Sequence, residues 1–258
     1  LSRTTTVPSD RARKDRRRQT RKAQSARQQA EQRRQRDKVR DRIRARPRPQ
    51  HEHPAVTALH EALYLANPGY TGRGTFSLDD GRITVADLAR CGLRDLEPLR
   101  GLPLRELYLE ENDVTDLAPL AGMPLVKLYL INNPVTDLAP LAGIEIEELN
   151  LVGTRVADLA PLRDLRLARS LWPSGSSKTG LRPLAHAPLI RLPVRHGPVA
   201  DLSALAQGPR LERLHVGDTR VTDLSPLAKL PLSRLLFDHD AIQQGLDAVR
   251  AIHTLIQI

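Results

Sequence analysis

The sequence predicts an α/β solenoid, in which parallel strands line a concave face and short helical or 3-10 turns line the convex face. The first observation is a unit of 21 residues that repeats from Ile83 onward in the 258-residue chain. The second is the alternation of leucines at the start of each unit, which is typical of short, half-buried strands. Because one unit is too small to bury its own leucines, several units must stack to form a continuous core. The units are 83–103, 104–124, 125–145, 146–166, 167–188, 189–210 and 211–231, followed by a truncated unit from Leu232.

Each unit opens with an L-x-x-L-x-L run that predicts one short strand. Leucines such as Leu107 and Leu109 are expected to point inward, because side chains alternate across a strand. A column of small residues follows each strand, and we expect its polar members to turn inward and satisfy backbone groups at the bend. This column contains Cys91, Asn112, Asn133, Thr154 and Thr219.

The second half of each unit has the pattern Asp-Leu-x-Pro-Leu, which predicts a short helical turn. Aspartate is a favoured N-cap residue, because its side chain accepts a hydrogen bond from the first free N–H groups of the helix. Proline is harmless in the first turn, where its missing N–H has no partner to lose. The predicted caps are Asp95, Asp116, Asp137, Asp158, Asp201 and Asp223.

These motifs give the chain a family resemblance over residues 83–252. The L-x-x-L-x-L runs and the V-x-D-L-x-P-L segments, as at 114–120, resemble bacterial leucine-rich repeat proteins of the internalin type, although the units have 21 rather than 22 residues. They are also similar to the short-repeat domains of large planctomycete-type proteins, some of which carry a kinase domain and a membrane span upstream. The resemblance implies a module that binds partner proteins and has no catalytic activity of its own.

Composition divides the chain into three parts. Residues 1–50 hold 19 Lys/Arg and 5 Asp/Glu and are predicted to be a disordered or transiently helical tail. Residues 51–82 are predicted to be a linker and N-terminal cap, with a helix over 55–70 and two strands around the turn at 79–81. Residues 83–258 form the predicted solenoid with its C-terminal cap.

The charge of the chain points first to an anionic partner. The net charge is +10, but the tail contributes +14 and residues 51–258 contribute −4. Non-specific contact with nucleic acid or an anionic surface is therefore assigned to the tail alone, which lacks the aromatic residues that stack on bases. A single cysteine excludes a disulfide framework, and no apolar run reaches the ~18 residues of a membrane span. The chain begins with Leu1, which suggests a fragment or processed chain, so the compartment stays open: cytoplasmic by default, or extracytoplasmic if a membrane span lies upstream.

The candidate binding site is the concave face of the predicted strands. Residues between the inward leucines face outward, and one column of them contains three of the chain's seven aromatic residues. Aromatic residues with a polar group are enriched at partner-binding surfaces, although an exposed tyrosine is also simply a good strand residue. The central column includes Tyr108, Tyr129, Asn150, Trp172 and His215.

Charged residues flank this column and change sign along it. Early units present Glu106, Lys127 and Glu148, whereas later units present Arg191, Arg195 and Arg213. Such a bipolar face suits a partner of complementary charge, and an ordinary solvated surface is the alternative.

Other chemistry is not expected. Residues 172–180 break the repeat and predict an irregular loop, but Ser177 precedes Lys178 where a phosphate-binding loop needs glycine. His51, His53 and His60 are expected to be solvated, while His196, His215 and His239 leave a metal or pH role open. We therefore expect no catalytic residue, no cofactor and no metal. The predicted function is a non-catalytic module that binds a protein on its concave face; the alternatives are attachment through the tail, or a sensor or scaffold role within a larger kinase-type protein.

Overall fold

The computed structural model describes residues 53–163, 169–173, 180–195, 197–208 and 210–256. The chain divides into two units at His51 and Glu52, and everything described belongs to the second unit. The predicted tail therefore lies outside the described residues, as do positions 174–179 of the predicted irregular loop.

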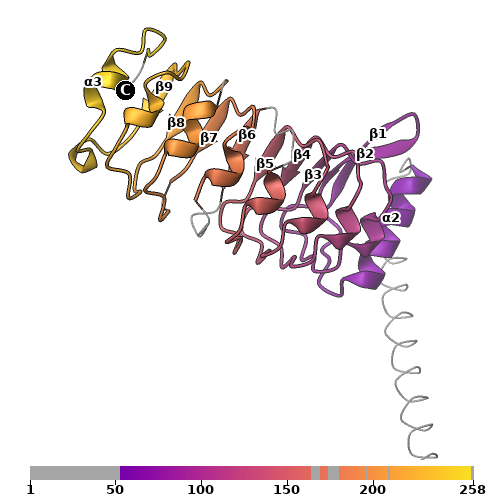
Figure 1. Ribbon diagram of the computed structural model, residues 1–258. Coiled ribbons are helices and arrows are strands. Elements are labelled where there is room, and N and C mark those ends of the chain that lie inside the picture. Colours follow the sequence, from indigo (N-terminus) through magenta and orange to yellow (C-terminus); the bar gives the residue numbers. More distant parts are fainter. Residues whose placement is uncertain (1–52, 164–168, 174–179, 196, 209, 257–258) are drawn as a thin grey trace, which may run out of the picture. The chain divides into compact units, whose positions relative to one another are not determined.

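The N-terminal cap and the repeats together form one sheet of nine strands whose spatial order is the order of the chain (Figure 1). β1 and β2 form an antiparallel hairpin, and every later pair is parallel. This arrangement confirms the predicted solenoid, because each unit adds one strand beside the strand of the unit before it. The strands are β1 (Thr75–Asp79), β2 (Arg82–Asp87), β3 (Glu106–Tyr108), β4 (Lys127–Tyr129), β5 (Glu148–Asn150), β6 (Ser170–Trp172), β7 (Arg191–Pro193), β8 (Arg213–His215) and β9 (Arg234–Leu236).

Short 3-10 turns run along the opposite side of the stack from the strands (Figure 1). They are η1 (Glu97–Leu99), η2 (Ala118–Leu120), η3 (Ala139–Leu141), η4 (Ala160–Leu162), η5 (Arg182–Leu184), η6 (Ser203–Gln207) and η7 (Ser225–Leu227). Proline recurs in every one of these turns except η6, and it suits them because the first N–H groups of a helix have no acceptor within it. The turn η8 (His239–Ala241) and helix α3 (Leu246–Arg250) close the described chain.

The repeated aspartates stand one residue before the position predicted for them. A leucine, such as Leu117 before η2, is the N-cap residue and makes no side-chain capping bond. The preceding Asp116 instead accepts a hydrogen bond from the N–H of Ala118 at 2.8 Å. Equivalent bonds join Glu97 to Asp95, Ala139 to Asp137, Ala160 to Asp158, Ser203 to Asp201 and Ser225 to Asp223. The carboxylates thus bind the first amide of each turn, as a cap does, from one position further upstream.

Glycine decides how a unit leaves its 3-10 turn. Ala121, after η2, has ψ 130° and is followed by Gly122 at φ 72°, which is the conformation of a type II turn. Later units have no glycine at this place, and Ala185, after η5, keeps the helical ψ of −34° before His186. A side chain at positive φ would be strained, so the later units take the helical exit.

Leucine fills the core, as the repeat predicts. Leu107, Leu109, Leu128 and Leu130 have no exposed surface, and the equivalent leucines of the other units are similarly buried. Cys91 is also buried within this core. Because each leucine contacts those of the units before and after it, burial of apolar area stabilises the stack as a whole rather than any unit alone.

Helix α2 (Pro54–Ala66) covers the first repeat, where the expected helix over 55–70 begins one residue early and ends four residues early. Its buried residues Val56, Leu59 and Leu63 lie on one face and pack toward η1 and β2. At the other end Val249 and Ile252 are buried against the last repeat. Within the described residues, no helix combines the length and the apolar character that a bilayer crossing requires.

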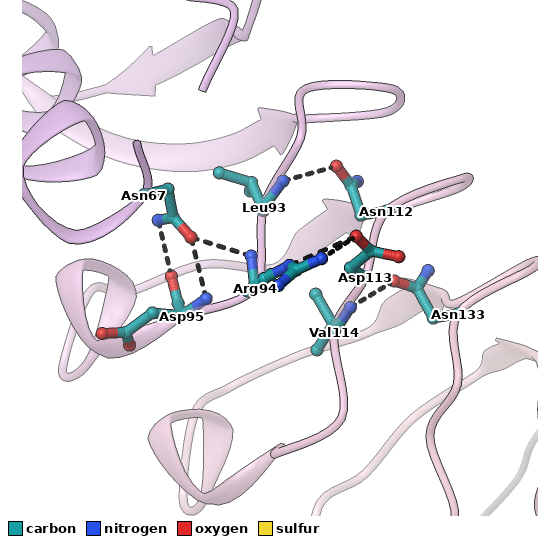
Figure 2. Close-up of polar contacts among 8 residues, drawn as sticks. All are labelled: Asn67, Leu93, Arg94, Asp95, Asn112, Asp113, Val114 and Asn133. Carbon is teal, nitrogen blue, oxygen red and sulfur yellow. Dashed lines mark hydrogen bonds and ion pairs between the residues drawn. The ribbon is translucent and has the colours of Figure 1, made fainter. Parts of the chain in front are cut away.

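Buried asparagines connect each early unit to the unit before it (Figure 2). Asn112 accepts hydrogen bonds from the N–H groups of Cys91 and Leu93, at 3.1 and 2.9 Å, and donates to the carbonyl of Leu88 at 2.9 Å. Asn133 repeats this arrangement one unit later and accepts from the N–H of Val114 at 3.0 Å. The inward-turned polar column is therefore present, and it satisfies backbone groups of two units at once.

The N-terminal cap continues the same pattern. Asn67, directly after α2, accepts from the N–H groups of Arg94 and Asp95, both at 2.8 Å, and donates to the carbonyl of Asp95 at 2.9 Å (Figure 2). The residue that ends the helix thus satisfies amides of the first repeat. An exposed ion pair between Arg94 and Asp113, at 2.9 Å, lies beside this row.

Replacing a buried asparagine should destabilise the stack. In Asn112→Ala, the buried N–H groups of Cys91 and Leu93 lose their acceptor, and each unsatisfied group costs about 1–3 kcal/mol. We expect the free energy of unfolding, measured by urea denaturation, to fall by at least ~2 kcal/mol. The control is Asn132→Gly, where the residue is exposed at φ 56° and glycine adopts that conformation freely. The control should change stability by less than about 0.5 kcal/mol, and equal losses in both variants would contradict the role of Asn112.

Candidate functional site

The predicted central column lies on the solvent-facing side of the sheet, the predicted concave face, which is called the outer face below. Its residues are in register on both sides of one interruption. Tyr108 pairs with Tyr129, Tyr129 with Asn150, and Asn150 with Trp172 across neighbouring strands. Pro193, His215 and Leu236 pair in the same way in the last three strands. Strands β6 and β7 pair only at Ser170 and Arg191, so the column is interrupted after Trp172.

Proline causes that interruption. In the early units the residue after each strand donates its N–H to the next strand, as Leu109 does to the carbonyl of Tyr129 at 2.9 Å. Pro173 stands at this place after β6 and has no N–H to donate, so the bond to β7 cannot form. The ladder resumes where Val194 donates to the carbonyl of His215 at 2.7 Å.

The three aromatic rings of the column contact one another. The ring centroids of Tyr108 and Tyr129 are 5.1 Å apart at an interplanar angle of 81°, and those of Tyr129 and Trp172 are 6.3 Å apart at 62°. Both are edge-to-face arrangements, which aromatic pairs prefer. The Asn150 side chain between them turns back to accept from the N–H of Val152 at 3.1 Å. All three rings are half-buried, so they keep an accessible edge.

The acidic residues beside these rings are held by partners within the chain. Glu106 accepts hydrogen bonds from the hydroxyl of Tyr108 at 2.6 Å and from Nζ of Lys127 at 3.0 Å. Glu148 accepts from the hydroxyl of Tyr129 at 2.8 Å. Glu106 and Lys127 thus form an ion pair at the early end of this face, whereas Glu148 is held by a neutral phenol.

Proton affinities follow from these contacts. Burial and the hydrogen bond to Glu148 raise the pKa of Tyr129 to about 12. Burial and the bond to Glu106 likewise raise the pKa of Tyr108 above its ordinary value. The bonds from Tyr108 and Lys127 lower the pKa of Glu106, because both stabilise its charged form. At neutral pH the phenols are donors and the carboxylate of Glu106 is ionised, which fixes the ring positions.

The basic residues at the other end are not neutralised in this way. Arg191 pairs in register with Arg213, and Arg213 with Arg234, so three guanidinium groups follow one another on adjacent strands. All three are exposed, and none forms an ion pair with a carboxylate of the described residues. Arg195 is exposed as well. The partial burial of His215 and the positive charge of Arg195 both lower the pKa of His215.

A hollow of about 230 Å³ opens beside Trp172 where the ladder is interrupted. It is lined by Trp172, Arg191, Pro193, Arg213, Leu214, His215, Arg234 and Leu236. The predicted residues Trp172, Arg191, Arg213 and His215 are thus brought together. Arg234, Pro193 and Leu236 were not predicted as site residues, although their places in the outward columns were the signal that could have included them. Val152, at 45 % exposure, adds an apolar side chain beside Asn150 that was also missed.

His60 was expected to be solvated, but it is half-buried, because its ring packs 5.8 Å from that of Tyr70 and 5.1 Å from that of Phe76, centroid to centroid. His60 is hydrogen-bonded to the hydroxyl of Tyr70 at 2.8 Å, and His53 accepts from the N–H of Ala55 at the start of α2. His51 and His196 lie outside the described residues. Among the residues that are described, no group of three His, Cys, Asp or Glu side chains could hold a metal ion.

The repeated strand and 3-10 turn define an internalin-like leucine-rich repeat fold, as the sequence pattern predicts. No family model and no curated protein matches the chain. Among solved structures, the internalin inlF from Listeria monocytogenes is 24% identical with a TM-score of 0.52, over 64% of this chain and 56% of that one. Internalin C2 from the same organism is 24% identical with a TM-score of 0.47, over 80% of this chain and 82% of that one. The match thus spans little more than half the length of inlF, and it establishes the fold.

The raised pKa of Tyr129 predicts an alkaline loss of stability. The ordinary pKa of tyrosine is about 10, so above that pH the unfolded chain releases the proton while folded Tyr129 retains it up to about pH 12. Its stabilising contribution should be complete below pH 10 and disappear between pH 10 and 12. We expect Glu148→Gln to shift the Tyr129 titration, followed by NMR, toward pH 10. Asp137→Asn is the control on the opposite side of the stack, and an unmoved titration in Glu148→Gln would contradict the assignment.

Proposed function

We propose that the repeat domain is a non-catalytic module that binds a protein partner on its concave face, the solvent-facing side of the sheet. The observation that supports this most directly is the contact between Tyr108, Tyr129 and Trp172 on a face where they keep accessible edges. Tyrosine and tryptophan contribute much of the energy of protein interfaces, because they bury large areas and offer a polar group. The comparisons support a repeat fold of this kind, and the partner and face are our proposal.

The held side chains suit this role. A side chain that is ordered only on binding costs about 0.5–1.5 kcal/mol of entropy. The phenols of Tyr108 and Tyr129 are already fixed by Glu106 and Glu148, so a partner meets rings that are largely in place. Asn150 lies beside Tyr129 on the next strand, and Lys127 lies opposite Glu106 in the flanking column, so both supply polar groups at the edge of the aromatic surface.

Photo-crosslinking would locate the contact face. In Tyr129→p-benzoylphenylalanine the reactive group projects from β4, and in the control Ala139→p-benzoylphenylalanine it projects from the exposed side of η3 one half-unit later. We expect a discrete crosslinked protein from a cell lysate with the first variant and none with the control.

Capture of that protein by Tyr108→Ala/Trp172→Ala should fall at least about tenfold, as expected for interface hot spots, whereas exposed Leu65→Ala should bind normally. A crosslink from position 139 and none from position 129 would place the interface on the side of the 3-10 turns and contradict the proposal.

A second candidate function follows from the charge of the tail. We propose that residues 1–50 contact nucleic acid through phosphate groups, because they carry a net +14 without aromatic residues. The affinity of the full chain for mixed-sequence DNA should fall with salt, with a logarithmic slope of about −0.9 for each phosphate contacted. Replacing Arg16, Arg17, Arg18, Arg33 and Arg34 by glutamine should flatten that slope. Arg191→Gln/Arg213→Gln should leave it unchanged, and a slope that follows the repeat arginines instead would exclude the tail.

A further inference from the structure

The strongest unexplained feature is an uncompensated row of positive charge beside an apolar hollow. Adjacent strands lie ~4.8 Å apart, so the backbones of Arg191, Arg213 and Arg234 are spaced by about that distance from one strand to the next. Like charges directly opposite each other on neighbouring strands destabilise a sheet. At the other end of the same face, Glu106 and Lys127 pair with each other. A row kept without internal partners is one that an external anion can neutralise.

The hollow restricts what that anion can carry. Its volume of about 230 Å³ is below the ~300–1,000 Å³ of sites for drug-sized ligands and cofactors, so one side chain fits better than a larger molecule. Trp172, Pro193 and Leu236 give it apolar walls, and the three arginines form a row along one side of them. Guanidinium groups form paired hydrogen bonds with carboxylates, which suits a ligand with acidic groups on both sides of an apolar one.

The sign of the charge excludes the chain's own tail as the occupant. Residues 1–50 carry +14, so the arginine row would repel them. The occupant must instead be negatively charged and come from another molecule. A protein segment meets the requirement for an apolar side chain within an acidic stretch.

We propose that the hollow beside Trp172 binds an acidic peptide segment of a protein partner, with one apolar side chain inserted between Trp172 and Leu236 and carboxylates on Arg191, Arg213 and Arg234. This inference rests on the proposed function and names the chemistry of the partner at one end of the face. The interruption at Pro173 gives the site its location, because the strands β6 and β7 are joined only at Ser170 and Arg191.

The chain contains a single tryptophan, Trp172, which lines this hollow and contacts Tyr129, so its fluorescence reports on this part of the face. The probe is a blocked peptide with a central leucine flanked by glutamates, titrated into the full chain. We expect a saturable change in Trp172 emission. A peptide that has glutamine in place of glutamate should produce no such change. A peptide that has serine in place of leucine should produce a much weaker change. Peptide bound to the tail would leave the emission unaltered.

Two double variants that remove the same amount of charge then test the arginines. Arg191→Gln/Arg213→Gln should raise the Kd of the leucine peptide at least about tenfold, since each charge-assisted contact contributes strongly. Arg182→Gln/Arg220→Gln removes the same charge from exposed positions outside the hollow and should leave the Kd unchanged. An equal effect of both pairs, or an unchanged emission of Trp172, would overturn the proposal.

Other occupants give different results. Inorganic phosphate that produces the same emission change as the peptide would overturn the peptide assignment, as would a change that grows with protein concentration and accompanies dimer formation in sedimentation. If the peptide fails while Tyr129→p-benzoylphenylalanine still crosslinks a protein, the binding face stands and this inference falls. If the peptide binds as expected while that crosslink is absent, the inference stands and the broader face is wrong.

Discussion

Each repeat satisfies its backbone polar groups with atoms of the next repeat, and the rest of the structure depends on this constraint. A unit has one strand of three residues and one short turn, so it has no second strand of its own to pair with. Asn112 and Asn133 extend the pairing beyond the strands, because each bonds to backbone groups of the preceding unit. Asn67 does the same from the end of α2 and joins the cap to the first repeat. The stack is therefore continuous in its hydrogen bonds as well as in its leucine core.

Because the strands are in strict register, residues that recur with the period of the sequence lie side by side on the surface. Because equivalent residues pair strand by strand, any side chain that recurs outside the leucine positions forms a row about 4.8 Å apart. Recurrent tyrosine produces rings in edge-to-face contact, as at Tyr108 and Tyr129. Recurrent arginine produces a row of like charges. The same geometry thus explains both the aromatic cluster and the basic row, without any insertion into the fold.

Much of this was predictable, because the fold depends on periodicity and periodicity is visible in a sequence. The leucine core, the inward asparagines and the outward aromatic column all follow from residue spacing. The aspartates were predicted as N-caps, but they lie one residue upstream of that position, because each carboxylate bonds the amide two residues further along the chain and the leucine between them is the cap. The bonds from Tyr108 and Tyr129 to glutamates were not predicted, since they depend on how far side chains reach across strands. The interruption after Trp172 had a visible signal, a proline where the earlier units have leucine, but its consequence for the ladder follows only from the strand pairing.

The two ends of the outer face differ in how completely they are satisfied, and that difference defines what each can do. At the early units, phenols, carboxylates and an ammonium group satisfy one another, so this region offers shape and aromatic area that are largely in place before binding. At the later units, a row of guanidinium groups lines one side of a hollow and has no carboxylate partner among the described residues. Buried or compensated charge contributes rigidity, whereas uncompensated charge contributes discrimination between partners and speeds their approach. A single repeat pattern can therefore supply a preformed contact area and a charge-selective one on adjacent strands, with the proline at 173 marking the boundary between them.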